Sequence, residues 1–115
     1  MEMSTNCLFC KIAAGEIPAE KLYEDDELLA FRDIAPQAPV HFLVIPKKHI
    51  QDPAGVEMAD EALMGRMIRT ASKVAKENNI SDFRLVFNNG AKAGQTVFHI
   101  HMHVLGGRSL NWPPG

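Results

Sequence analysis

The alternation of apolar and polar residues along this chain predicts one long helix, one short helix and about five strands. The clearest helical pattern runs from about Glu57 to Asn79, where apolar residues recur at every third or fourth position. These apolar positions are Leu63, Met64, Met67, Ile68, Ala71, Val74 and Ala75. The spacing predicts one buried face, with the methionines in the core. Asp60 near the start and Asn79 at the end are typical of helix termini.

Strand patterns lie on both sides of this helix. The expected strands are residues 20–25, 28–33, 40–45, 83–89 and 99–106. The first two meet at the acidic turn Asp25–Asp26, Pro46 stops the third, and GAKAGQTV forms a loop before the last. The segment CLFCKIAAGEIPAE predicts a short helix that ends at Gly15. Because strands come in neighbouring runs with a single long helix between them, we expect an α+β fold: an antiparallel sheet covered by that helix.

Composition narrows the class of protein. The chain has 115 residues, 46% hydrophobic and 23% charged, so residues 1–115 are expected to form a single soluble domain. A net charge of −2 gives no general attraction to nucleic acid or anionic membranes, and any anionic ligand needs a local site. The sequence has no apolar run of about 18 residues, and its N-terminus does not resemble a signal peptide. We therefore expect a cytoplasmic protein.

The stretch HIHMHVLGGR, residues 99–108, is the strongest candidate for chemistry. On a strand, His99, His101 and His103 would share one face and Ile100, Met102 and Val104 the other. Such a row is compatible with ordinary hydrogen bonding, with a metal site, or with phosphoryl chemistry in which a neutral imidazole is the nucleophile.

The loop NNGAKAGQT directly upstream favours phosphoryl chemistry. Gly90 and Gly94 allow backbone N–H groups to converge on an anion, and Thr96 adds a hydroxyl donor next to Gln95. A flexible hairpin loop is the alternative. A glycine-containing loop that leads into a histidine row predicts a phosphate site.

The pair CLFC, Cys7 and Cys10, allows three interpretations: a redox dithiol, half of a zinc site, or two small buried residues. Without a secretion signal, a structural disulfide is less expected. Zinc needs two further ligands, for which His49 and His99 are the best candidates.

Other residues carry weaker patterns. Phe9, Phe31 and Ile34 are candidates for an apolar slot for a base, with core packing as the alternative. Asp33 is a candidate for ribose contacts or for a simple turn. His41 begins an apolar strand, so burial requires a partner for it, and Trp112 is expected to dock on the domain.

Taken together, these motifs resemble the histidine triad (HIT) family. HIHMHVLGG fits the pattern His-φ-His-φ-His-φ-φ, where φ is apolar, and the resemblance covers nearly the whole chain. The segments PQAPVHFLVIPKKHI and WPPG resemble the Hint branch, the histidine triad nucleotide-binding proteins. Asn111 stands where animal members commonly have histidine.

The resemblance implies a homodimer with one sheet continuous across two protomers. It also implies binding of purine nucleoside monophosphates and hydrolysis of phosphoramidates such as adenosine 5′-monophosphoramidate, with no metal required for catalysis. The alternatives are a dinucleoside polyphosphate hydrolase and a nucleotide- or zinc-binding regulatory protein with incidental hydrolysis.

Residue roles follow from the same resemblance. His101 would take up the nucleotidyl group and His103 would contact the α-phosphate, while His41 and His99 would support them. The leaving amine would receive its proton through Thr96 or a histidine. The expected phosphate-side residues are Asn88, Gly94, Gln95 and Thr96, with Asp33 on the ribose and Phe9, Phe31 and Ile34 around the base. The pair Cys7 and Cys10, with His49 and His99, is similar to a structural zinc site of some bacterial members.

Overall fold

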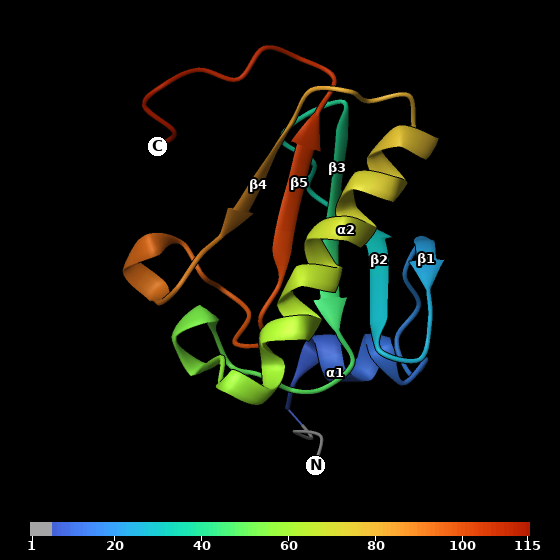
Figure 1. The fold of residues 1–115 in the computed structure, drawn as a ribbon, viewed down its shortest axis with the longest axis vertical. Coiled ribbons are helices and arrows are strands. Elements are labelled where there is room, and N and C mark those ends of the chain that lie inside the picture. Colours follow the sequence, from blue (N-terminus) through green and yellow to red (C-terminus); the bar gives the residue numbers. More distant parts are fainter. Residues whose placement is uncertain (1–5) are drawn as a thin grey trace.

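The computed structural model describes residues 6–115 and confirms the α+β fold (Figure 1). Its helices are α1 (Leu8–Ala13) and α2 (Glu61–Glu77), and its strands are β1 (Lys21–Glu24), β2 (Leu28–Arg32), β3 (Val40–Pro46), β4 (Phe83–Phe87) and β5 (Met102–Gly106). Short 3-10 turns occupy Pro53–Gly55, Met58–Asp60 and Ala91–Ala93. The five strands form one antiparallel sheet in the order β1-β2-β3-β5-β4.

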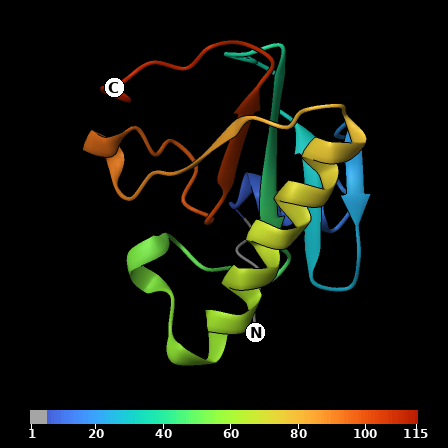
Figure 2. The same ribbon diagram turned by 45° about the horizontal axis from the view of Figure 1, so that its top comes forward.

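The central strands are buried on both faces, and alternate residues serve two separate cores. Leu28 and Ala30 of β2 join the core beneath α2, while Leu29 and Phe31 join a smaller core with α1. This follows from the alternation of side chains along a strand. The helix α2 lies across one face of the sheet in both views (Figures 1 and 2), and α1 packs against the other face.

The long helix is shorter than the predicted range from about Glu57 to Asn79, although it contains every apolar position of the pattern. It begins at Glu61, because Glu57 and Asp60 cap a preceding 3-10 turn, and Asn79, with a φ of 60°, follows its C-terminal end. Ile68 does not belong to the buried face and is 49% exposed. Thr70 is buried instead, because it lies three residues after Met67, where the helical repeat returns to the same face.

Two expectations about the C-terminal region are wrong. The last strand begins at Met102, so His99 and His101 precede the sheet ladder, although Ile100, Met102 and Val104 do enter the α2 core as expected. Trp112 is 81% exposed and does not dock, because the segment after β5 leaves the sheet (Figure 1). Within residues 6–115, no helix has the length and apolar character needed to cross a bilayer.

Candidate active site

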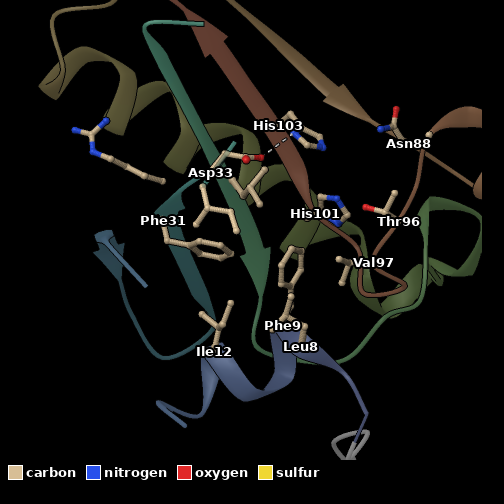
Figure 3. Close-up of a pocket in the computed structure, with 14 residues that line it drawn as sticks. Leu8, Phe9, Ile12, Phe31, Asp33, Asn88, Thr96, Val97, His101 and His103 are labelled. Carbon is tan, nitrogen blue, oxygen red and sulfur yellow. Dashed lines mark ion pairs between the residues drawn. The ribbon is translucent and has the colours of Figure 1, made fainter. Parts of the chain in front are cut away.

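A cavity of about 340 Å³ lies between α1, the strands β2 and β3, and the loop that leads into β5 (Figure 3). Its volume is in the range of small-molecule sites. One wall is mainly apolar and the other is polar. The lining residues are Leu8, Phe9, Ile12, Phe31, Arg32, Asp33, Ile34, Leu43, Asn88, Gly94, Thr96, Val97, His101 and His103.

His101 is held in one tautomer by the backbone. Its Nδ1 lies 2.8 Å from the carbonyl oxygen of His99, and because a carbonyl can only accept, Nδ1 carries the proton. The neutral ring therefore keeps its lone pair on Nε2. Phe9 packs edge-on against the same ring, with centroids 5.0 Å apart. His101 is thus a fixed imidazole with a nucleophilic nitrogen in a ligand-sized cavity.

His41 and His103 form a second ordered pair. The backbone N–H of Gln37 donates to Nδ1 of His41 at 3.0 Å, so the proton of His41 is on Nε2. That atom lies 2.9 Å from Nδ1 of His103 and 3.5 Å from a carboxylate oxygen of Asp33. His103 accepts at Nδ1 and therefore carries its own proton on Nε2, as a donor for a ligand.

Burial keeps these imidazoles neutral. It lowers the pKa of His103 to about 4, helped by the neighbouring His101 and His41 rings and opposed by the Asp33 carboxylate. Burial also lowers the pKa of His101 and of His41, again against the opposing charge of Asp33. Neutral rings at pH 7 agree with the tautomers that the backbone contacts require.

The conformation of the loop before β5 is fixed by a glycine and by a buried glutamine. Gly94 has a φ of 99°, a conformation that favours glycine, and it lies beside Asn88 at the cavity. Gln95 is buried and does not line the cavity. Its amide accepts from the N–H of Gly90 and donates to the carbonyls of Gln51 and Val97. Gln95 therefore organises the loop, where the family resemblance implied a phosphate-side position.

Cys7, Cys10, His49 and His99, named here the Cys–His cluster, bring four donor atoms within 4.8 Å of one another. Nε2 of His99 donates to the carbonyl of Pro46 at 2.7 Å, which leaves the lone pair of Nδ1 for the cluster. That Nδ1 lies 3.2 Å from Nδ1 of His49, 3.3 Å from Sγ of Cys7 and 3.4 Å from Sγ of Cys10.

These separations fit zinc. A tetrahedral zinc ion with Zn–N of about 2.0 Å and Zn–S of about 2.3 Å separates two nitrogens by about 3.3 Å, and nitrogen from sulfur by about 3.5 Å. The two thiols are not joined in a disulfide. By contrast, Asp33, His41 and His103 also converge, but His41 directs an N–H at this group and offers no lone pair to a metal.

Most of the residues expected from the sequence meet at this cavity. Phe9, Phe31, Asp33, Asn88, Thr96, His101 and His103 line it, as do Gly94 and the fully exposed Ile34. His41 and His99 stand directly behind it. Sequence reasoning missed Leu8 and Ile12, which the i, i+4 spacing on α1 could have identified, and also missed Val97 and Leu43.

Comparisons with known proteins agree with this geometry. Residues 14–110 match the family model described as the HIT domain. An uncharacterized HIT-like protein of Synechocystis sp. is 53% identical over 114 residues, which cover 98% of this chain and 100% of that protein. A related HIT-like protein of Synechococcus elongatus, also uncharacterized, is 50% identical over 98% of this chain and 100% of its own length.

Solved structures give the same result. The crystal structure of a HIT family hydrolase from Legionella pneumophila Philadelphia 1 has a TM-score of 0.93 at 54% identity, over 96% of this chain and 100% of that one. A histidine triad protein from Clostridium difficile has a TM-score of 0.92 at 41% identity, over 96% of this chain and 97% of that one. The arrangement of the histidines, the sheet topology and these matches lead to one conclusion: the chain belongs to the HIT family.

Proposed function

We propose that this protein is a hydrolase of the Hint type, which cleaves the P–N bond of purine nucleoside phosphoramidates and releases the nucleoside monophosphate. One observation carries the proposal: His101 donates Nδ1–H to the carbonyl of His99 and keeps a lone pair on Nε2 in the cavity. A neutral imidazole held in this way is suited to nucleophilic attack on phosphorus. The hydrolase from Legionella is a relative with the same fold.

The cavity offers a separate surface to each part of such a substrate. The base would lie against the apolar wall, where Phe9 and Phe31 pack edge to face at 5.5 Å and Ile12 contributes from the same helix as Phe9. The carboxylate of Asp33 would accept hydrogen bonds from ribose hydroxyls. Asn88, Gly94 and Thr96, which line the polar wall, would face the phosphate.

In the first step, Nε2 of His101 attacks phosphorus and the bond to the amine breaks. His103 donates Nε2–H to a phosphate oxygen and so stabilises the developing charge. The departing amine takes a proton from the exposed Thr96 hydroxyl, which takes one in turn from solvent. The product is a nucleotidylated His101 that still holds its Nδ1–H bond to His99.

In the second step, water attacks phosphorus and the bond to His101 breaks. The nucleoside monophosphate leaves, the water proton passes to solvent, and His101 returns to the neutral tautomer in which it began. The proton consumed in the first step is thus released in the second. Each step uses only side chains and backbone groups that line or support the cavity.

Three further properties belong to the proposal. The Cys–His cluster would hold a structural zinc ion through its four side chains, which connect α1 to the loops before and after the central strands. The edge strand β4, with half-buried side chains on both faces, would pair with a second copy and continue the sheet in a homodimer. Cys7 and Cys10 are not joined in a disulfide, which supports a reducing, cytoplasmic location.

Rapid mixing with adenosine 5′-monophosphoramidate, followed by acid quenching and mass spectrometry, tests the reaction. We expect a nucleotidylated protein in the wild type and none in His101→Ala. Labelling that persists in His101→Ala would contradict the assignment of the nucleophile. Faster turnover of a dinucleoside polyphosphate than of the phosphoramidate would favour that hydrolase class instead. A His101→Ala protein that fully performs the cellular role would favour a regulatory protein.

A further inference from the structure

The Cys–His cluster contacts both the nucleophile and the base wall of the nucleotide site. On the nucleophile side, His99 is fully buried, and its Nε2–H bond to Pro46 and its Nδ1 contacts hold its ring at two points. The same residue presents the carbonyl that fixes His101 at 2.8 Å. His99 therefore belongs to the Cys–His cluster through its ring and to the nucleotide site through its backbone carbonyl.

This carbonyl is not held by the sheet. The strand β5 begins at Met102, three residues after His99, so the ladder with β3 does not set its direction. The nearest backbone restraint is the bond from the N–H of Ile100 to the carbonyl of Ile50, at 2.6 Å. The carbonyl of His99 and the N–H of Ile100 belong to one planar peptide group, so this bond sets the direction of the carbonyl. The bond joins the loops that carry His49 and His99, and the cluster holds those two loops together through the same two side chains.

On the base side, the cluster holds the first turn of α1. Cys7 is the N-cap of this helix and accepts from the N–H of Cys10 at 3.2 Å. Leu8 and Phe9 lie between the two cysteines and line the cavity. Both cysteines pack in the smaller core with Phe31, apart from the core beneath α2. A substitution in the cluster should therefore alter the geometry of the nucleotide site more than the packing of the core beneath α2.

We propose that the Cys–His cluster is a positioning unit for the nucleotide site: it orients His101 through the carbonyl of His99, sets the wall formed by Phe9, and couples metal binding to nucleotide binding. The inference rests on the proposed function. Coupling of this kind is reciprocal, so a nucleotide that tightens zinc binding by some factor has its own affinity raised by the same factor. Typical couplings span about 5-fold to 150-fold.

The first test uses the wild-type protein. Zinc affinity is measured by competition with a chromophoric chelator, with and without saturating adenosine 5′-monophosphate, and nucleotide affinity is measured by calorimetry with and without zinc. We expect both factors to agree and to be about fivefold or more. Two factors equal to one would overturn the positioning role. Absence of nucleotide binding, with zinc uptake intact, would instead overturn the proposed function.

The second test uses His49→Asn on the protein as purified. His49 contributes a ligand to the cluster but is not among the residues that line the cavity. We expect the rate constant for nucleotidylation of His101 at saturating substrate to fall about tenfold. Since 1.4 kcal/mol corresponds to a factor of ten, this is a small change in orientation energy. The matched control is Gln51→Ala, an exposed side chain two residues along the same loop.

Ring ¹⁵N chemical shifts separate positioning from general stability. In the wild type and in Gln51→Ala, His101 should show one tautomer with the proton on Nδ1. In His49→Asn we expect shifts that indicate a mixture of tautomers, while dispersed amide signals show that the fold is retained. Wild-type shifts together with a wild-type nucleotidylation rate would refute the proposal. If His49→Asn does not fold, the reciprocal affinities of the wild type decide.

Discussion

The low pKa of His103 predicts a specific loss of stability in acid. Burial lowers this pKa to about 4 in the folded protein, against an ordinary value of about 6.5 for an exposed histidine. Above pH 6.5 both the folded and unfolded states hold a neutral ring, so the folded state suffers no penalty. Below pH 6.5 the unfolded chain binds a proton that the folded protein resists. The contribution of His103 to the free energy of unfolding is therefore fully present above its pKa in the unfolded chain, about 6.5, and is lost as the pH falls toward 4.

The size of the loss follows from the same two pKa values. Each unit of difference is worth about 1.4 kcal/mol, so His103 alone should lower the free energy of unfolding by about 2 kcal/mol between pH 7 and pH 5. Near pH 4 the loss should approach about 3 kcal/mol. The side chain is 21% exposed, which leaves burial as the dominant influence.

Urea unfolding at several pH values measures this contribution. In His103→Asn the amide oxygen can still accept from Nε2 of His41, but the residue no longer titrates. We expect a flatter dependence of the unfolding free energy on pH in this variant, and a wild-type dependence in the control Ser109→Ala. Superimposable curves for His103→Asn and the wild type would refute the assignment of a buried, neutral His103.

Three other predictions concern the core, the loop and the metal site. Met67→Ala, at a fully buried position of α2, should lower the unfolding free energy by about 2–5 kcal/mol in urea, and a loss below about 1 kcal/mol would contradict the described packing. Gly94→Ala should weaken binding of adenosine 5′-monophosphate about tenfold in calorimetry, because a φ of 99° strains any other residue by about 1–2 kcal/mol. An unchanged affinity would show that the loop does not contact the phosphate. Removal of zinc by a strong chelator should lower the melting temperature by several degrees, and an unchanged melting temperature together with no zinc in elemental analysis would exclude the structural metal.

The sequence predicted the sheet and the histidine face because both depend on strict local periodicity. Val40–Pro46 is apolar except for His41 and forms the central strand β3, buried on both faces. Met102, His103 and Val104 alternate between faces as their spacing requires. Such patterns are decided by burial alone, and a single sequence contains them in full.

Features that depend on a specific hydrogen bond could not be predicted in this way. Gln95 turns inward because three backbone groups of neighbouring segments reach its amide. His99 and His101 precede the last strand because β3 pairs with β5 only as far as Met102, opposite Val44. The exposure of Trp112 reflects a terminal segment that extends away from the sheet. No periodicity records any of these contacts.

The same dependence on single backbone bonds explains how three identical side chains acquire different chemistry. The carbonyl of Pro46 accepts a hydrogen bond from Nε2–H of His99, so the lone pair of this ring is on Nδ1, which faces the Cys–His cluster. The carbonyl of His99 accepts a hydrogen bond from Nδ1–H of His101, so the lone pair of this ring is on Nε2. The tautomer of His103 is set indirectly. The N–H of Gln37 places the proton of His41 on Nε2, and that N–H then donates to Nδ1 of His103. Backbone groups do not titrate, so these assignments persist for as long as burial keeps the rings neutral. The histidine pattern therefore supplies the ring nitrogens, and the surrounding backbone decides which of them carries a proton and which keeps a lone pair.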